Sequence, residues 1–228
     1  RRTCNPGGHR GLRPVHLRCV DQVDPAVDRQ RHHLGRMVHA LAEAGRFAEA
    51  EALATETIRV AREGLQFTGI GLAHLALGWS YVLRGRATDA DVALAEAEGW
   101  LTEARHRGMV RWALIARALG WLHAGDLERG KVLRDRLSAI GPHPAAIFDT
   151  NLARVDAWIA ARTGHPGTAV DLLQRAAADA RAVGNVVNAI GCAHDLARLG
   201  RPELGLRAIG DHERGDRIGV DDVEGRFL

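Results

Sequence analysis

The chain has 228 residues, 46% of them hydrophobic, so it is long enough to bury a core either as one domain or as a short array of repeats. It contains no run of 18 apolar residues, which argues against a membrane-spanning helix. The 31 basic residues outnumber the 28 acidic ones, but the excess lies in residues 1–36, and residues 37–210 are close to neutral. A body with so little net charge gives no support to nucleic-acid binding by this segment.

The first segment, residues 1–24, is basic and lacks the apolar periodicity of a helix, so we expect it to be disordered. It contains residue types that bind zinc, namely Cys4, His9, His16 and Cys19. They lack the close Cys-x-x-Cys spacing of a zinc finger, so we expect no metal site. The three cysteines of the chain are odd in number and far apart, which favours a reducing cytoplasm over a disulfide framework.

A short marker recurs five times between residues 25 and 210. Its glycines are Gly45, Gly85, Gly125, Gly164 and Gly200, at spacings of 40, 40, 39 and 36 residues. Seven residues before each glycine stands a small residue: Val38, Gly78, Ala118, Ala157 and Ala193. Five residues after it stands another: Ala50, Ala90, Gly130, Ala169 and Gly205. This period predicts helical hairpins in which glycine ends the first helix in a left-handed conformation and the small residues let the two helices approach closely.

The predicted elements follow in pairs. Helices are expected over 25–44 and 46–63, 67–84 and 87–105, 109–124 and 126–139, 144–163 and 166–183, and 186–199 with a short 202–209. The turns between pairs are placed at Gly64, near Gly108, at Gly141 and at Gly184. Residues 211–228 show no apolar stripe and are expected to form a loose acidic tail.

The marker, Gly-Arg-x-x-x-Ala with a small residue seven positions earlier, resembles that of tetratricopeptide (TPR) repeats over about 25–210. The repeat is longer than the usual 34 residues of that family. With alanine-rich second helices such as 172–177, it is similar to the MalT-like helical region of large LuxR-type bacterial transcription regulators. The resemblance implies an all-α, right-handed α-solenoid of about five antiparallel hairpins.

Those regulators carry an ATPase domain before the repeats and a helix-turn-helix after them. This chain has no Gly-x-x-x-x-Gly-Lys-Ser/Thr loop and no segment that we interpret as a helix-turn-helix. We therefore expect a cytoplasmic, non-catalytic module that senses an effector, binds a protein or peptide, or self-associates within such a regulator. The alternative is a free-standing TPR adaptor that binds a partner peptide in its concave groove.

In TPR arrays the first helix of each hairpin lines the concave groove. By resemblance, the line consists of the residues six positions before each marker glycine, namely His39, Trp79, Leu119, Trp158 and His194. Alongside it fall Arg154, Arg162 and Arg198, with His123 and Asn151. Tryptophans and arginines together could hold an acidic or aromatic peptide, or a small effector, by stacking and paired hydrogen bonds. Alternatively, the tryptophans only fill contacts between hairpins and the arginines lie in water.

No pattern indicates catalysis. Asp89 and Asp91 stand at the start of a predicted helix, where carboxylates favour the helix dipole. His194 and Asp195 are adjacent, so on a helix they point in different directions and are unsuited to a catalytic pair. Neither Gly-x-Ser-x-Gly nor His-Glu-x-x-His occurs. We therefore expect no enzyme activity, no catalytic residue and no cofactor.

Overall fold

The computed structural model describes residues 37–144 and 151–207, and the described part of the chain is helical without any strand. The helices are α2 (Phe47–Glu63), α3 (Phe67–Leu83), α4 (Ala87–Glu103), α5 (Arg107–Ala124), α6 (Leu127–Ile140), α7 (Leu152–Arg162), α8 (Pro166–Ala182) and α9 (Val186–Arg198). Residues 37–43 and 202–207 are also helical. The predicted tails, 1–24 and 211–228, lie outside the described residues. None of the helices in the described part is both long enough and apolar enough to cross a membrane.

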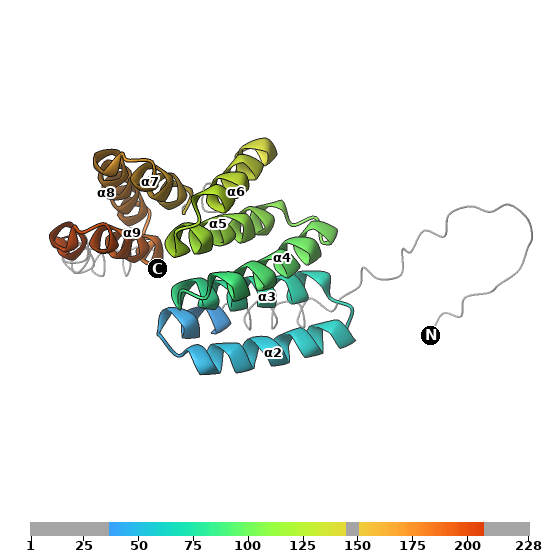
Figure 1. Ribbon diagram of the computed structural model, residues 1–228. Coiled ribbons are helices and arrows are strands. Elements are labelled where there is room, and N and C mark those ends of the chain that lie inside the picture. The colour runs from blue at the N-terminus through green and yellow to red at the C-terminus, as the bar shows by residue number, and fades with distance from the viewer. Residues whose placement is uncertain (1–36, 145–150, 208–228) are drawn as a thin grey trace, which may run out of the picture.

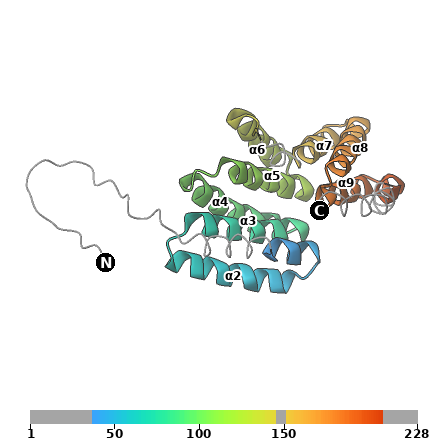
Figure 2. The same ribbon diagram turned by 180° about the vertical axis from the view of Figure 1, so that it is seen from behind.

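The helices form hairpins that pack in sequence order. Each helix contacts the next one along the chain, and α3 also packs on α5 and α5 on α7. Figures 1 and 2 show this succession rising from α2 through α5 and then turning aside through α7, α8 and α9. The first helices of successive hairpins therefore form a row, with each second helix beside its own partner. The all-α hairpin array predicted from the repeat period is confirmed at this level.

The marker glycines end the first helix of each hairpin as predicted. All five have positive φ, between +71° at Gly85 and +95° at Gly125. Beside Gly125, the N–H of Asp126 donates to the Trp121 carbonyl at 2.9 Å, and the Gly125 N–H donates to the Leu122 carbonyl at 3.2 Å. This pair of bonds is the Schellman closure of a helix C-terminus. Asp126 then begins α6, and its Oδ1 accepts from the Arg129 N–H at 3.0 Å.

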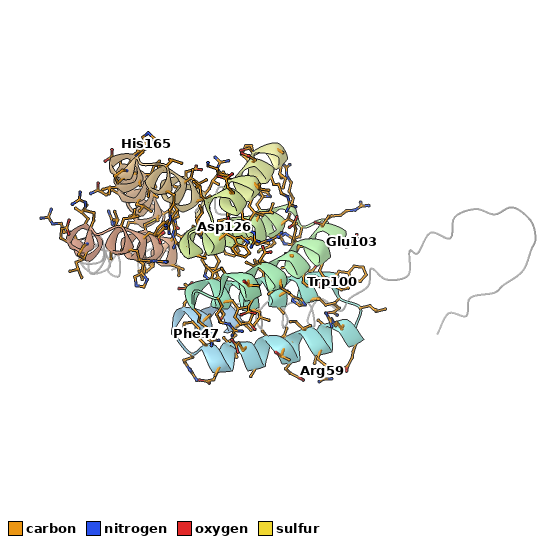
Figure 3. The ribbon with its side chains drawn as sticks, viewed as in Figure 1. Phe47, Arg59, Trp100, Glu103, Asp126 and His165 are labelled. Atoms are coloured by element: carbon orange, nitrogen blue, oxygen red, sulfur yellow. The ribbon has the colours of Figure 1, made fainter. Side chains whose placement is uncertain are left out.

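Figure 3 shows Asp126 at the turn into α6 and His165 at the corresponding turn into α8. The Schellman hydrogen bonds form at both of these turns, although the residue after the glycine differs. Helix ending and helix restarting are local events, which is why a short sequence marker predicts them.

Two turns between hairpins differ from the prediction. Before α3 the left-handed residue is Leu65 (φ +51°), whereas Gly64 has φ −89°. Before α5 it is Arg105 (φ +56°), and Gly108 lies buried inside α5 rather than in a turn. The Gln66 N–H still donates to the Ala61 carbonyl at 2.9 Å, so the Schellman hydrogen bonds are kept. Packing between these helices of 17 and 18 residues fixes the turn position, and the residue found there accepts the strained conformation.

The fourth hairpin also begins later than predicted. Pro144 is not helical and α7 starts at Leu152, eight residues after the predicted start at 144. Residues 145–150 lie outside the described residues. Asn151, at the N-cap, has a turn conformation with ψ near 0°.

The core explains why the flanking positions of the marker are small. All ten of the small residues paired around the five glycines are buried. A Cβ added to Gly130 would lie 2.5 Å from Leu122 Cδ2, and one added to Gly205 would lie 2.6 Å from the Ala193 carbonyl oxygen. The large central cluster is contributed by α3 to α7, and a second cluster joins α7, α8 and α9. Cys192 is fully buried in that second cluster.

Candidate functional site

A buried ion pair joins the first helices of the last two hairpins. Arg154 on α7 donates from Nε to Oδ2 of Asp195 on α9 at 2.6 Å, and from Nη1 to Oδ1 of Asn151 at 3.0 Å. The three residues are between 1% and 7% exposed. Burial alone would raise the pKa of Asp195, but the charge of Arg154 and the contacts from Arg154 and His123 hold that pKa well below its usual value.

His123 brings α5 into the same cluster. Its Nε2 lies 3.3 Å from Oδ1 of Asp195, in a geometry that falls outside that of a hydrogen bond, so their attraction is electrostatic. Its ring meets the Trp158 ring edge-on, with centroids 5.1 Å apart and planes at 70°. Burial lowers the pKa of His123 more strongly than Asp195 raises it. The cluster therefore links α5, α7 and α9 through one shared carboxylate.

The Arg154 guanidinium fits because α9 has a glycine beside it. A Cβ added to Gly191 would lie 2.6 Å from Arg154 Nη1. The close approach of a buried cation to the α9 backbone thus depends on the missing side chain at this position.

An open hollow of about 370 Å³ adjoins the cluster, lined by Trp158, Ala161, Arg162, Arg198 and Leu199. Below we call it the Trp158 pocket. The guanidinium carbons of Arg198 and Arg162 lie 5.2 Å and 5.7 Å from the centre of the Trp158 ring. Arg162 also donates to the Leu122 carbonyl at 3.3 Å. Within 37–144 and 151–207 neither arginine forms an ion pair, so two positive charges meet beside one indole ring. This arrangement favours an anionic ligand.

Of the ten residues predicted for the groove, six lie together in the cluster or at the pocket: His123, Asn151, Arg154, Trp158, Arg162 and Arg198. Trp79 and His39 lie near the other end of the row, where Trp79 Nε1 donates to Glu43 Oε1 at 2.9 Å and the His39 ring is 6.0 Å from that of Trp79. Leu119 is fully buried in the central core and offers no surface to a ligand. His194 is exposed on α9, away from the cluster.

Asp195 is the residue of the cluster that the sequence analysis set aside. It was considered only as a catalytic partner for its neighbour His194, and the two do point in different directions. The available signal was its place among Cys192, Ala193 and Leu196, the buried face of the helix, where a carboxylate requires a partner.

The cluster holds α5, α7 and α9 together by pairing buried polar and charged side chains. The Asp195 carboxylate is occupied by Arg154 and His123. Across the described ranges, no three histidine, cysteine, aspartate or glutamate side chains gather in a way that could hold a metal ion. The residues considered for zinc, Cys4, His9, His16 and Cys19, lie outside those ranges.

No protein-family model matches the sequence, and no curated protein matches it significantly.

Proposed function

We propose that this chain is a non-catalytic helical-repeat interaction module, and that the Trp158 pocket binds an anionic group of its partner. The observation that carries the proposal is the meeting of Arg162 and Arg198 beside Trp158 without a carboxylate partner among the described residues. Because the Arg154–Asp195 pair joins α7 and α9, which carry Arg162 and Arg198, both arginines are placed at the same pocket before any ligand arrives.

The shape of the pocket favours a side chain of a partner protein over a free small molecule. Sites for small molecules enclose most of the ligand surface, whereas this hollow is open to solvent and has five lining residues. Ala161 and Leu199 supply an apolar wall beside the charges. The proposed ligand is therefore an acidic peptide segment in which a glutamate or aspartate has an aliphatic neighbour.

The test uses a fluorescein-labelled peptide that contains two adjacent glutamates between leucines, titrated into the full chain and followed by fluorescence anisotropy. We expect Arg162→Gln and Arg198→Gln each to weaken binding by roughly ten- to a hundredfold, since a charged hydrogen bond contributes about 1.5–3 kcal/mol. Arg175→Gln, at an exposed arginine of α8 away from the pocket, is the matched control. Equal binding of a peptide with glutamine in place of glutamate would refute the proposal.

We further propose that the module is a right-handed, TPR-like solenoid that serves as the effector-sensing or protein-interaction arm of a LuxR-type transcription regulator. The support is the repeat period and the resemblance of its sequence pattern. Sequencing of the DNA on both sides of this coding segment tests the context. An ATPase domain before it and a helix-turn-helix after it are expected, whereas unrelated domains would contradict this assignment. A segment bracketed by stop codons would favour the free-standing adaptor.

A further inference from the structure

Helix α9 carries an exposed stripe on one face. Val187 and Ile190 are 45% and 39% exposed, and His194 is exposed one turn further along. The spacing of three and four residues places them on the same side of the helix. Below we call these three residues the α9 stripe.

The register of the repeat explains what the stripe corresponds to. Ile190 and His194 stand ten and six residues before their marker glycine, Gly200. In the three preceding hairpins, the same two positions are Leu75 and Trp79, Ile115 and Leu119, and Arg154 and Trp158. All six of these residues are buried. Among these four hairpins, the two positions are exposed only in the last one.

The earlier hairpins also show what buries these positions. Helix α3 packs on α5, and α5 packs on α7. On α7, Arg154 bonds to Asp195 of α9, and Trp158 meets the guanidinium of Arg198 on α9. Each of these first helices is therefore followed by another first helix that packs on it, and on α7 that neighbour lies against the two positions. The α9 stripe occupies the corresponding positions of the last described hairpin, and within residues 37–144 and 151–207 no further first helix packs on it.

We infer that the α9 stripe is an interaction surface for an amphipathic helix of a partner protein, docked where the first helix of a following hairpin would lie. Val187 and Ile190 call for aliphatic residues on that helix. His194 and Arg198, one and two turns further on, call for acidic residues after the aliphatic ones. Arg198 is exposed and has no carboxylate partner among the residues that the structure describes.

Charge decides against a second copy of α9 as the occupant. The sequence of α9 contains one acidic residue, Asp195, which is 1% exposed and paired with Arg154. Two copies of α9 packed stripe to stripe would offer no carboxylate to His194 and Arg198. A partner helix with its own glutamates satisfies both requirements, the apolar and the ionic one.

The test uses a synthetic helical peptide of about 18 residues, a length at which an isolated helix begins to be stable. In this peptide, leucines placed about one turn apart form one face of the helix, and glutamates continue that face toward one end. Its affinity for the full chain is measured by fluorescence anisotropy, with circular dichroism to verify that every protein variant is folded. We expect Val187→Glu and Ile190→Glu each to weaken binding at least tenfold. The matched control is Val132→Glu at a 60% exposed valine of α6, which should bind as the parent does.

Two further comparisons make the result decisive. A peptide with lysines in place of the glutamates should bind at least tenfold more weakly, and Arg162→Gln, which alters the Trp158 pocket, should leave binding to the stripe unchanged. Unchanged affinity of a folded Ile190→Glu protein, or equal binding of the lysine peptide, would overturn the inference. So would a parent protein whose sedimentation shows a dimer that Ile190→Glu dissociates, since the stripe would then be covered by a second copy. Because Arg198 borders both sites, Val187→Glu and Ile190→Glu test the stripe and Arg162→Gln tests the pocket, so failure of one hypothesis leaves the other standing.

Discussion

Arg154 and Asp195 form a salt bridge of 2.6 Å between α7 and α9, with side chains 8% and 1% exposed. They are 41 residues apart, close to one repeat. Because both charges are buried, each depends on the other for its solvation. The pair also fixes the relative position of the two helices that carry Arg162 and Arg198, so it supports the pocket without touching a ligand.

The first prediction concerns the loss of one partner. Arg154→Met leaves the Asp195 carboxylate buried with only His123 nearby, and we expect the free energy of unfolding to fall by roughly 3–5 kcal/mol. Urea denaturation followed by circular dichroism measures this change.

The double variant Arg154→Met/Asp195→Leu removes both charges and is expected to recover most of that loss, since replacing a whole buried ion pair by apolar residues is often close to neutral. A double variant as unstable as the single one would show that packing around the guanidinium, rather than the charge of Asp195, sets the cost.

The second prediction concerns acid sensitivity through His74 on α3. Both of its ring nitrogens are buried without a hydrogen-bond partner within the described ranges. Burial lowers the pKa of His74, Glu96 raises it in part, and Arg62 lowers it further. The unfolded chain, with a histidine pKa of about 6.5, therefore binds more protons than the folded chain below that pH. The contribution of neutral His74 to stability is complete above about pH 6.5 and is lost as the pH falls below it.

His74→Phe should accordingly flatten the fall in the free energy of unfolding between pH 7 and pH 5. One proton taken up on unfolding contributes at most about 1.4 kcal/mol per pH unit. His39 and His123 also have lowered pKa values because of burial, so part of the slope should remain. A slope equal to that of the parent would rule out a contribution from His74.

The third prediction concerns the two strained turns. Leu65 and Arg105 have positive φ, where a residue with a Cβ is disfavoured by about 1 kcal/mol relative to glycine. Leu65→Gly and Arg105→Gly should each raise the free energy of unfolding by roughly 0.5–1 kcal/mol. Ala104→Gly is the matched control, because Ala104 has φ −73° and gains no relief from glycine. Thermal unfolding that shows both turn variants less stable than the parent would contradict the prediction.

The fourth prediction compares two helical glycines. A Cβ at Gly130 would lie 2.5 Å from Leu122 Cδ2, whereas a Cβ at Gly99 would have no neighbour within 4 Å. Gly130→Ala should destabilise the protein by about 1–3 kcal/mol through overpacking. Gly99→Ala should stabilise it by roughly 0.5–1 kcal/mol, since alanine favours a helix. Melting temperatures that rise in both variants would show that the close contact at Gly130 is relieved without cost.

The sequence by itself determined the hairpin array. A helix ends where a glycine can adopt positive φ, and two helices come close where their side chains are small. Both conditions depend on residues a few positions apart, so Gly125, Gly130 and their four counterpart pairs could be recognised from the repeat. It also singled out Arg154, Trp158 and Arg198 as residues of interest, although their role as a binding site stays a prediction.

Only the tertiary structure decided which residues meet. Leu65 and Arg105 accept strained turns because the packing of long helices sets the turn position. Arg111, fully enclosed within the array, donates to the Leu137 carbonyl at 3.2 Å and to that of Gly141, so it caps the end of α6 from another helix. Asp195 finds Arg154 one repeat away. Such partners depend on how each helix is rotated against its neighbour, and that rotation results from the packing of the whole array rather than from any single stretch of the chain.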